Sequence, residues 1–281
     1  MKSDFAYCLY VTNPQYLCNA VMMLESLERV GTRASRLLLF PDTWPTQEST
    51  PTPTGKLLAQ AQHLGATLQP IQLQHSTTGE PTWADSYTKL LAFNQTQFKR
   101  VISLDTDATV LQSLDELFLY PSTPVAAPIA YWLKDRTLSS QLMLIEPSDV
   151  EFLKIMDQIQ HHKDTDFDME IVNNLYGDTA TIIPHRPYDL LTGEFRAENH
   201  TLYLGDGKRT WNATRELQNA KLVHFSDWPI PKPWLASEDD IQSGKPPCRS
   251  DDDCRDQDAW LWMYRDFSLR KRRICDQIPE R

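Results

Sequence analysis

The sequence has no excess of positive charge. Its 281 residues include 28 lysines and arginines against 38 acidic residues, which gives a formal net charge of -10. A surface that binds nucleic acid in general needs a basic excess to neutralise phosphates, so this composition argues against nucleic acid as a partner. Any contact with a phosphate group must come from a few local cations or from a metal ion.

Long apolar runs are also absent. No stretch of about 18 consecutive apolar residues occurs, and residues 1–10 lack the charged flank and apolar core of a secretory signal. Hydrophobic residues make up 41% of the chain and charged residues 23%, which is the composition of an ordinary soluble globule. We therefore expect neither a membrane span nor a signal peptide in this chain.

The cysteines lack the spacing of a metal site. They are Cys8, Cys18, Cys248, Cys254 and Cys275. Cys248 and Cys254 flank a short polar loop and could close a small disulfide in an oxidising compartment, whereas two free thiols are the alternative.

Residues 101–111 combine the pattern of a buried strand with two closely spaced acidic residues. Residues 101–104 are mostly apolar and predict a buried strand, and Asp105 and Asp107 follow at its carboxyl end. Open parallel sheets bind ligands at that end. Two hard carboxylate ligands there suit Mg²⁺ or Mn²⁺ with a phosphorylated substrate, although an isolated Asp-x-Asp is more often a solvated turn.

The rest of the chain alternates between strand and helix patterns. Apolar, β-prone runs occur at residues 6–12, 36–40, 67–73, 138–145, 181–184 and 221–225. Helical patterns occur at residues 15–29, 56–64, 86–98 and 149–161. This alternation predicts one α/β domain with a mostly parallel central sheet flanked by helices. The polar segment 185–196, with embedded aromatic residues, has the composition of an ordered loop that lines a cleft.

Three further residues carry charge at informative positions. Lys89 lies near the start of the expected helix 86–98, where a cation opposes the helix dipole unless an anion is bound nearby. His224 falls near the end of a short strand. Lys232 is the lone cation in residues 226–234, where three prolines and two tryptophans predict a rigid extended backbone. Taken singly, Lys89 can be explained as a solvated surface lysine and His224 as a hydrogen-bonded core histidine. Residues 226–234, with Lys232, can be explained as a packed structural loop.

Taken together and in their order along the chain, the acidic pair, these charged residues and the strand and helix patterns resemble glycosyltransferase family 8, the glycogenin-like retaining enzymes. The resemblance extends over residues 7–234 and is strongest at residues 85–90, 138–142, 168–173 and 224–229. These four segments are most similar to the fungal branch related to yeast Golgi N-acetylglucosaminyltransferase. The resemblance implies a single GT-A (Rossmann-like) nucleotide-sugar-binding domain over residues 1–245, with a C-terminal loop and helix at 246–281 packed on it.

The resemblance implies a binding site for the nucleotide of a UDP-sugar. Thr12, Asn13 and Tyr16 match the uridine-binding turn after the first strand, with Tyr16 stacked on uracil. Lys89 matches a lysine that contacts the donor. Lys232 matches the lysine that binds the diphosphate.

The resemblance also implies a metal site. Asp105 and Asp107 match the family's Asp-x-Asp motif and His224 matches its third ligand, for Mn²⁺ or alternatively Mg²⁺. Asp105 and the backbone of Thr106 would also lie near the ribose.

On the sugar side, this chain departs from glycogenins. Ser139, Ser140 and Gln141 follow a leucine where glycogenins have Phe-Asn-Ser-Gly, and Asp168 precedes a methionine where they have Asp-Gln. We expect the three residues 139–141 to bind the donor, and Asp168 and Lys89 to act in catalysis. The identity of the sugar cannot be copied, so UDP-GlcNAc and UDP-Glc are the first donors we expect. No tyrosine matches a self-glucosylation acceptor, which implies a separate acceptor.

The function implied is a retaining, metal-dependent transfer of a sugar from a UDP-sugar to a hydroxyl group of a glycan. A metal-dependent phosphohydrolase would use the same two acids, and a catalytically inactive glycan-binding module would use Trp228 and Trp234 as stacking platforms.

Location is left open by the sequence. Formal glycosylation sequons begin at Asn94, Asn199 and Asn212, and together with the cysteine pair they favour the Golgi or another secretory lumen. The protein would then be a catalytic domain without its membrane anchor, and the cytoplasm is the alternative. The sequence predicts no oligomeric state.

Overall fold

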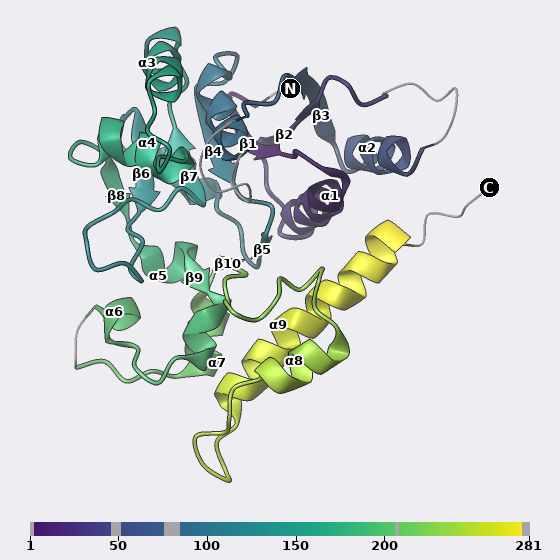
Figure 1. The fold of residues 1–281 in the computed structure, drawn as a ribbon, viewed down its shortest axis with the longest axis vertical. Helices are drawn as coiled ribbons and strands as arrows, with labels where there is room; N and C mark the ends of the chain where they lie inside the picture. Colours follow the sequence, from purple (N-terminus) through teal and green to yellow (C-terminus); the bar gives the residue numbers. More distant parts are fainter. Residues whose placement is uncertain (1–2, 46–51, 76–84, 206–207, 277–281) are drawn as a thin grey trace.

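The computed structural model describes residues 3–45, 52–75, 85–205 and 208–276, which form an α/β fold around a seven-stranded sheet (Figure 1). The order of its strands is β3-β2-β1-β4-β7-β6-β8. These are β1 (Phe5–Tyr10), β2 (Ser35–Pro41), β3 (Ala66–Ile71), β4 (Arg100–Leu104), β6 (Val125–Pro128), β7 (Leu142–Ile145) and β8 (Thr181–Ile183). Neighbours are parallel except where β7 pairs with β4 and β6. The expected mostly parallel sheet is therefore confirmed.

A second, three-stranded sheet lies beside the first. Its strands, in the order β5-β10-β9, are β5 (Ala108–Val110), β10 (Leu222–His224) and β9 (Leu190–Leu191). β5 is antiparallel to β10, and β9 is parallel to β10. Because β4 ends at Leu104 and β5 begins at Ala108, the chain crosses from one sheet to the other through Asp105, Thr106 and Asp107.

Helices cover both faces of the large sheet. The α-helices are α1 (Pro14–Arg29), α2 (Pro53–His63), α3 (Asp149–Gln160), α4 (Asp168–Tyr176), α5 (His185–Tyr188), α6 (Thr201–Leu204), α7 (Ala213–Asn219), α8 (Glu238–Gly244) and α9 (Arg255–Lys271). The tighter 3₁₀ segments are η2 (Ser86–Asn94), η3 (Asp115–Leu119) and η4 (Thr192–Arg196), and a π-helical turn, η5 (Arg272–Asp276), follows α9.

The side chains of β1 alternate between two apolar clusters, as expected for a strand buried on both faces. Tyr7 and Leu9 belong to the cluster that includes α1 and α2. Ala6 and Cys8 belong to the cluster that includes η2, α3 and α4. The core thus has one layer on each side of the sheet.

α1 shows how local sequence sets the chain direction after β1. The side chain of Asn13 accepts hydrogen bonds from the backbone N–H groups of Gln15 and Tyr16, and Pro14 occupies the first turn. A cap of this kind is worth roughly 1 kcal/mol. The helix stops before Gly31, whose φ of 73° lies in the left-handed region that glycine adopts most easily.

Three predicted segments are wrong in type or extent. The loop expected over residues 185–196 is instead α5, β9 and η4. The helix expected over residues 86–98 is the 3₁₀ segment η2, in which buried side chains outnumber exposed ones, so packing overrides helical propensity. The strand expected from residue 138 begins only at Leu142. The backbone of Leu138 is hydrogen-bonded to the side chain of Asn173, which accepts from the Leu138 N–H at 2.7 Å and donates to the Leu138 C=O at 3.0 Å.

α9, drawn in yellow in Figure 1, runs along one side of the molecule and is tied to α1. A disulfide joins Cys18 in α1 to Cys275, which lies 257 residues later in η5. Arg270 of α9 donates to the backbone C=O of Met22 at 2.7 Å and forms a 3.0 Å ion pair with Glu25. The sequence did not predict this disulfide.

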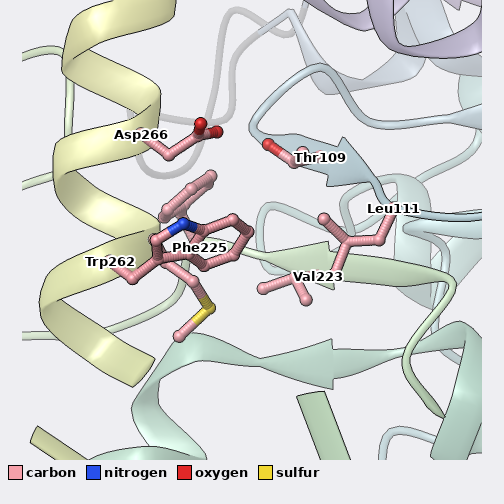
Figure 2. Close-up of a pocket in the computed structure, with 7 residues that line it drawn as sticks. Thr109, Leu111, Val223, Phe225, Trp262 and Asp266 are labelled. Atoms are coloured by element: carbon pink, nitrogen blue, oxygen red, sulfur yellow. The ribbon is translucent and has the colours of Figure 1, made fainter. Parts of the chain in front are cut away.

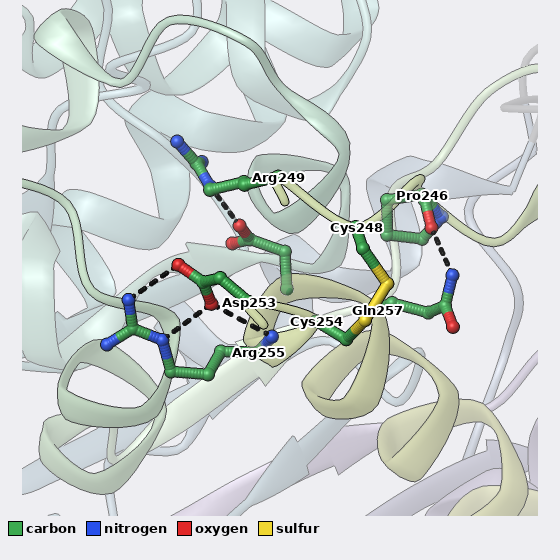
Figure 3. The surroundings of a disulfide bond; sticks show 8 residues. Pro246, Cys248, Arg249, Asp253, Cys254, Arg255 and Gln257 are labelled. Atoms are coloured by element: carbon green, nitrogen blue, oxygen red, sulfur yellow. Dashed lines mark hydrogen bonds and ion pairs between the residues drawn. A yellow bond between two sulfur atoms is a disulfide. The ribbon is translucent and has the colours of Figure 1, made fainter. Parts of the chain in front are cut away.

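The sequence left undecided whether Cys248 and Cys254 form a disulfide or are free thiols. Cys248 and Cys254 are bonded, and the loop between them is held by ion pairs of Arg249 with Asp256 and of Asp253 with Arg255 (Figure 3). Cys8 is a buried free thiol.

α9 packs over the small sheet and leaves a shallow hollow between them (Figure 2). Trp262 and Asp266 of α9 face Thr109 and Val223 across it. Its cavity volume is only about 10 Å³, roughly what one water molecule needs, and none of the predicted site residues lines it.

In the part of the chain that the structure describes, no helix combines the length and the apolar character needed to cross a bilayer.

Candidate active site at the junction of the two sheets

The predicted nucleotide-binding residues lie where the strand order reverses. β2 and β3 lie on one side of β1 and β4 lies on the other, so the carboxyl ends of β1 and β4 form a topological switch point. Ligands bind at such points in open α/β sheets. Thr12 and Asn13 follow β1 there, and Asp105 follows β4.

The turn after β1 presents an aromatic ring to this point. Tyr16 is half-buried, and its ring packs edge-on against Trp234 with centroids 5.7 Å apart. Burial raises the pKa of Tyr16 to about 12, and the nearby charges of Asp107 and Asp105 add to this effect. Because Oδ1 of Asn13 caps α1 and its backbone C=O accepts from the N–H of Leu17, the side-chain amide nitrogen and the backbone N–H of Asn13 are the groups left for a ligand.

One polar cluster surrounds Asp105. We call it the Lys89 cluster: Lys89, Asp105, Ser140 and Asp168. Nζ of Lys89 lies 2.6 Å from Asp168 Oδ2, 2.9 Å from Asp105 Oδ1 and 3.3 Å from Ser140 Oγ. Ser140 also donates to Asp168 at 2.7 Å. Lys89 is only 4% exposed, so two carboxylates, rather than solvent, neutralise its charge.

A second cluster surrounds Asp107. We call it the Asp107 cluster: Asp107, His224 and Lys232. Oδ2 of Asp107 lies 3.1 Å from Nε2 of His224 and 2.9 Å from Nζ of Lys232. Lys232 also donates to the backbone C=O of Phe225. The pairing of β10 with β5 sets His224 opposite Ala108, directly after Asp107.

Of the predicted sugar-side residues, Ser140 and Asp168 belong to the Lys89 cluster, and residues 139–141 directly precede β7. Ser139 is fully buried, and the backbone C=O of Gln141 accepts a 3.0 Å hydrogen bond from the N–H of Asp105. The side-chain oxygen of Gln141 is buried and makes no hydrogen bond within the described residues. Thr106 is buried between the two acids.

The predicted metal ligands converge in part. Asp107 and His224 contact each other, whereas Asp105 faces Lys89. Within residues 3–45, 52–75, 85–205 and 208–276, no three His, Cys, Asp or Glu side chains stand together as a metal site. The donor set of two carboxylates and one imidazole suits Mn²⁺ or Mg²⁺. Among the described residues Nδ1 of His224 is buried without a partner, whereas Nε2 lies 3.1 Å from Asp107 and is therefore the nitrogen placed to share an ion with that carboxylate.

The two acids differ in their protonation. Burial raises the pKa of Asp105 to about 7, and the charges of Asp107 and Asp168 add to this against the opposing effect of Lys89. Burial acts on Asp107 in the same direction, but His224 and Lys232 hold its pKa well below the usual range. Burial lowers the pKa of His224, which favours the neutral imidazole that binds metals.

Sequence reasoning missed three residues at this site. Tyr10, assigned to the apolar strand, donates to Asp105 at 3.4 Å, and its position at the carboxyl end of β1 was the available signal. Asp189 is fully buried, neither of its oxygens makes a hydrogen bond within the described residues, and burial raises its pKa to about 7. It lies in the segment expected to line a cleft.

The third missed residue is Asp227, which joins this region to α9. It accepts hydrogen bonds from Trp260 Nε1 and the Tyr264 hydroxyl, each at 3.0 Å, and from Thr192. It lies in residues 224–229, one of the segments that carry the resemblance, and that was the available signal, although no role was assigned to it.

Comparison with known proteins shows which sequences this chain is similar to. No family model matches the sequence. A Gibberella zeae protein named glucose N-acetyltransferase 1 is 49% identical over 285 residues, covering 98% of this chain and 63% of the relative. A protein of the same name from Aspergillus fumigatus is 41% identical, over 98% of this chain and 78% of the relative.

The chain belongs to the glucose N-acetyltransferase 1 family. It spans less than two thirds of the length of the Gibberella zeae member. That both relatives are fungal agrees with the resemblance described above.

A solved structure supports the fold expected of a glucose N-acetyltransferase 1 family member. The galactosyltransferase LgtC, solved with donor and acceptor sugar analogues, superposes with a TM-score of 0.60 at 14% identity, covering 97% of both chains. This confirms the GT-A-like fold.

Proposed function

We propose that this protein is a retaining glycosyltransferase of family 8 that moves a sugar from a UDP-sugar to a hydroxyl group of a glycan. The observation that carries the proposal is the position of Asp105 and Asp107. They lie at the switch point, on the crossing between the sheets, and each has its own cationic partners. A site with separate cations around two adjacent carboxylates is suited to a substrate that carries a diphosphate.

The turn after β1 would bind the nucleotide. Tyr16 would stack on uracil, supported from the side by Trp234, while Thr12 and Asn13 offer polar groups beside it. Asp105 and the Thr106 backbone would lie near the ribose. Lys232, whose side chain is about one third exposed, would bind the diphosphate and stabilise the charge that develops on UDP as it leaves.

Asp168 and Lys89 would act at the transferred sugar, together with Ser139, Ser140 and Gln141. Burial acts to raise the pKa of Asp168. The positive charge of Lys89, and the hydrogen bonds that Lys89 and Ser140 donate to Asp168, outweigh burial and hold this pKa below its usual value. The carboxylate is therefore ionised and can stabilise positive character at the anomeric carbon. The acceptor oxygen forms the new bond as the bond to UDP breaks, and the acceptor proton passes to the leaving phosphate oxygen.

Asp105, Asp107 and His224 would hold Mn²⁺, with Mg²⁺ as the alternative. When bound, the ion would supply Lewis acidity to the diphosphate. Asp105 would have to exchange its contact with Lys89 for the ion.

The first donors to test are UDP-GlcNAc and UDP-Glc, the donors that the family resemblance implies. Two disulfides and the exposed sequon residues Asn94 and Asn199 support an oxidising secretory lumen such as the Golgi as the location.

The test is an incubation of the protein with a panel of UDP-sugars, with Mn²⁺, with Mg²⁺ and with a chelator, with and without hexose oligosaccharides. We expect UDP release that needs the metal and rises with an acceptor, and a product that keeps the anomeric configuration of the donor. Release of inorganic phosphate without sugar transfer would favour a phosphohydrolase. Glycan binding that survives chelation without any turnover would favour an inactive binding module.

A further inference from the structure

Trp228 is displayed to solvent. It is 91% exposed, which makes it the most exposed large hydrophobic side chain among the described residues. Trp260, by contrast, is fully buried. A single exposed apolar residue needs no special explanation by itself, so the inference depends on how the chain holds this one.

The backbone on both sides of Trp228 is fixed. Asp227 has a side chain that is 1% exposed, bonded to Trp260 and Tyr264 of α9, and its backbone C=O accepts from Arg196 at 3.0 Å and from the N–H of Ile230 at 2.8 Å.

Two residues after Trp228, the side chain of Ile230 is also held. It packs so closely on Gly244 that a Cβ at that position would lie 2.6 Å from Ile230 Cδ1. A rigid support for an exposed indole lowers the entropy lost when a ligand binds it.

The loop that carries Trp228 begins and ends at the candidate active site. His224 and Lys232 both contact Asp107, and Lys232 also reaches back to the C=O of Phe225. Trp228 is four residues from each anchor, so its Cα lies within roughly 14 Å of both, the reach of four extended residues. This upper limit leaves room for one or two sugar rings between Trp228 and the phosphate end of the donor.

We propose that Trp228 is a stacking platform for a hexose ring of the acceptor glycan, an inference that rests on the proposed sugar transfer. The flat apolar face of indole matches the C–H face of a pyranose, and its N–H can donate to a hydroxyl. The uracil already has a ring partner in Tyr16, so a second nucleotide contact is not needed. A membrane contact would call for several cations beside the indole, and the lone cation of residues 226–234, Lys232, is paired with Asp107.

The test compares Trp228→Ala with Trp262→Ala, a matched control, because Trp262 is also exposed, at 47%, but lies on α9 beside the hollow of Figure 2. The probes are methyl hexosides and hexose oligosaccharides. Acceptor KM and donor KM are measured from UDP release, and binding of the same oligosaccharides is measured by calorimetry without donor.

For Trp228→Ala we expect acceptor KM and the calorimetric Kd to rise by about tenfold, the size of one aromatic contact. Donor KM and acceptor-free hydrolysis should stay unchanged, and Trp228→Phe should recover part of the affinity. Trp262→Ala should behave as the wild type.

Unchanged acceptor KM and oligosaccharide affinity in Trp228→Ala would overturn the inference, as would a wild-type protein that binds none of the probes. Loss of binding to anionic phosphatidylserine vesicles with intact glycan affinity would make the loop a membrane contact instead. If the wild type binds oligosaccharide through Trp228 but releases no UDP from any donor, the proposed function fails and the platform remains.

Discussion

Asp105 and Asp107 are separated by one residue, yet their surroundings differ. Asp105 belongs to the Lys89 cluster, whose members lie on and around the seven-stranded sheet and whose cation is 4% exposed. Asp107 belongs to the Asp107 cluster, whose histidine comes from the three-stranded sheet and whose cation is 34% exposed. The two carboxylates are about equally exposed, at 16% and 15%. The comparison therefore teaches that one Asp-x-Asp can place one acid beside a buried cation and the other beside a cation that solvent or a ligand can reach.

The two clusters should therefore respond differently to loss of their cation. A buried carboxylate that loses its partner destabilises the protein strongly, whereas a partly exposed ion pair contributes little to stability. The Lys89 cluster should be needed for folding as well as for donor binding, and the Asp107 cluster mainly for binding and catalysis.

The largest effect is expected for Lys89→Met. It leaves Asp105 and Asp168 buried without their cation, and the free energy of unfolding should fall by roughly 3–5 kcal/mol. Urea denaturation at neutral pH measures it. Lys154→Met is the control, because its ion pair with Glu151 is 52% exposed on the lysine side, and it should change stability by less than about 1 kcal/mol. Equal effects of the two variants would contradict the distinction between buried and exposed cations.

Asp107→Asn should act on turnover. It removes the charge that His224 and Lys232 both contact, and UDP-sugar turnover should fall by about 100-fold, the usual scale for removing one charged group from such a site. The apparent affinity for Mn²⁺, measured by titration of activity, should fall with it. Asp157→Asn, on the exposed side of α3, is the control. Full metal-dependent turnover in Asp107→Asn would show that the metal assignment is wrong.

Asp189→Asn should change the pH dependence of stability. Because burial raises the pKa of Asp189 from 3.8 to about 7, the folded state keeps this proton at pH values where the unfolded chain has lost it. The contribution of Asp189 to the free energy of unfolding is therefore fully present at pH values below the pKa of 3.8 in the unfolded chain. It falls as the pH rises towards 7, by up to about 1.4 kcal/mol per pH unit. Asparagine cannot ionise, so the variant should show a flatter profile in urea denaturation between those values. Superimposable pH profiles would mean that Asp189 does not titrate in this range.

The smallest stability effect is expected for Lys232→Met. Its side chain is 34% exposed, and the free energy of unfolding should fall by less than about 1 kcal/mol. Donor KM should nevertheless rise by about tenfold, since a diphosphate contact is lost. A large loss of stability with unchanged donor KM would reverse the proposed difference between the two cations.

Much of the fold could be predicted from local sequence. The apolar run of β4, the Asn13-Pro14 start of α1 and Gly31 after it act within a few residues, and the structure confirms the elements they predict. The family resemblance, rather than local sequence, assigned Lys89, Asp105 and Asp168 to one donor site, but it did not predict that Lys89 pairs with both acids.

The rest depended on contacts between distant residues. Asp189 and Asp227 became significant only through burial and through partners far along the chain. The length of β7 depended on Asn173, and the type of η2 on packing around Tyr87 and Lys89. No pattern within a window of a few residues carries that information.

The Cys18–Cys275 disulfide joins residues that are 257 positions apart and so closes that part of the chain into a covalent ring. Lys89, both acids, His224 and Lys232 all lie inside it. One backbone cut anywhere within the ring leaves a single molecule, so a nicked protein would migrate as two fragments only after reduction. Two cuts are needed to release a piece, which gives the protein tolerance to a protease that attacks it once.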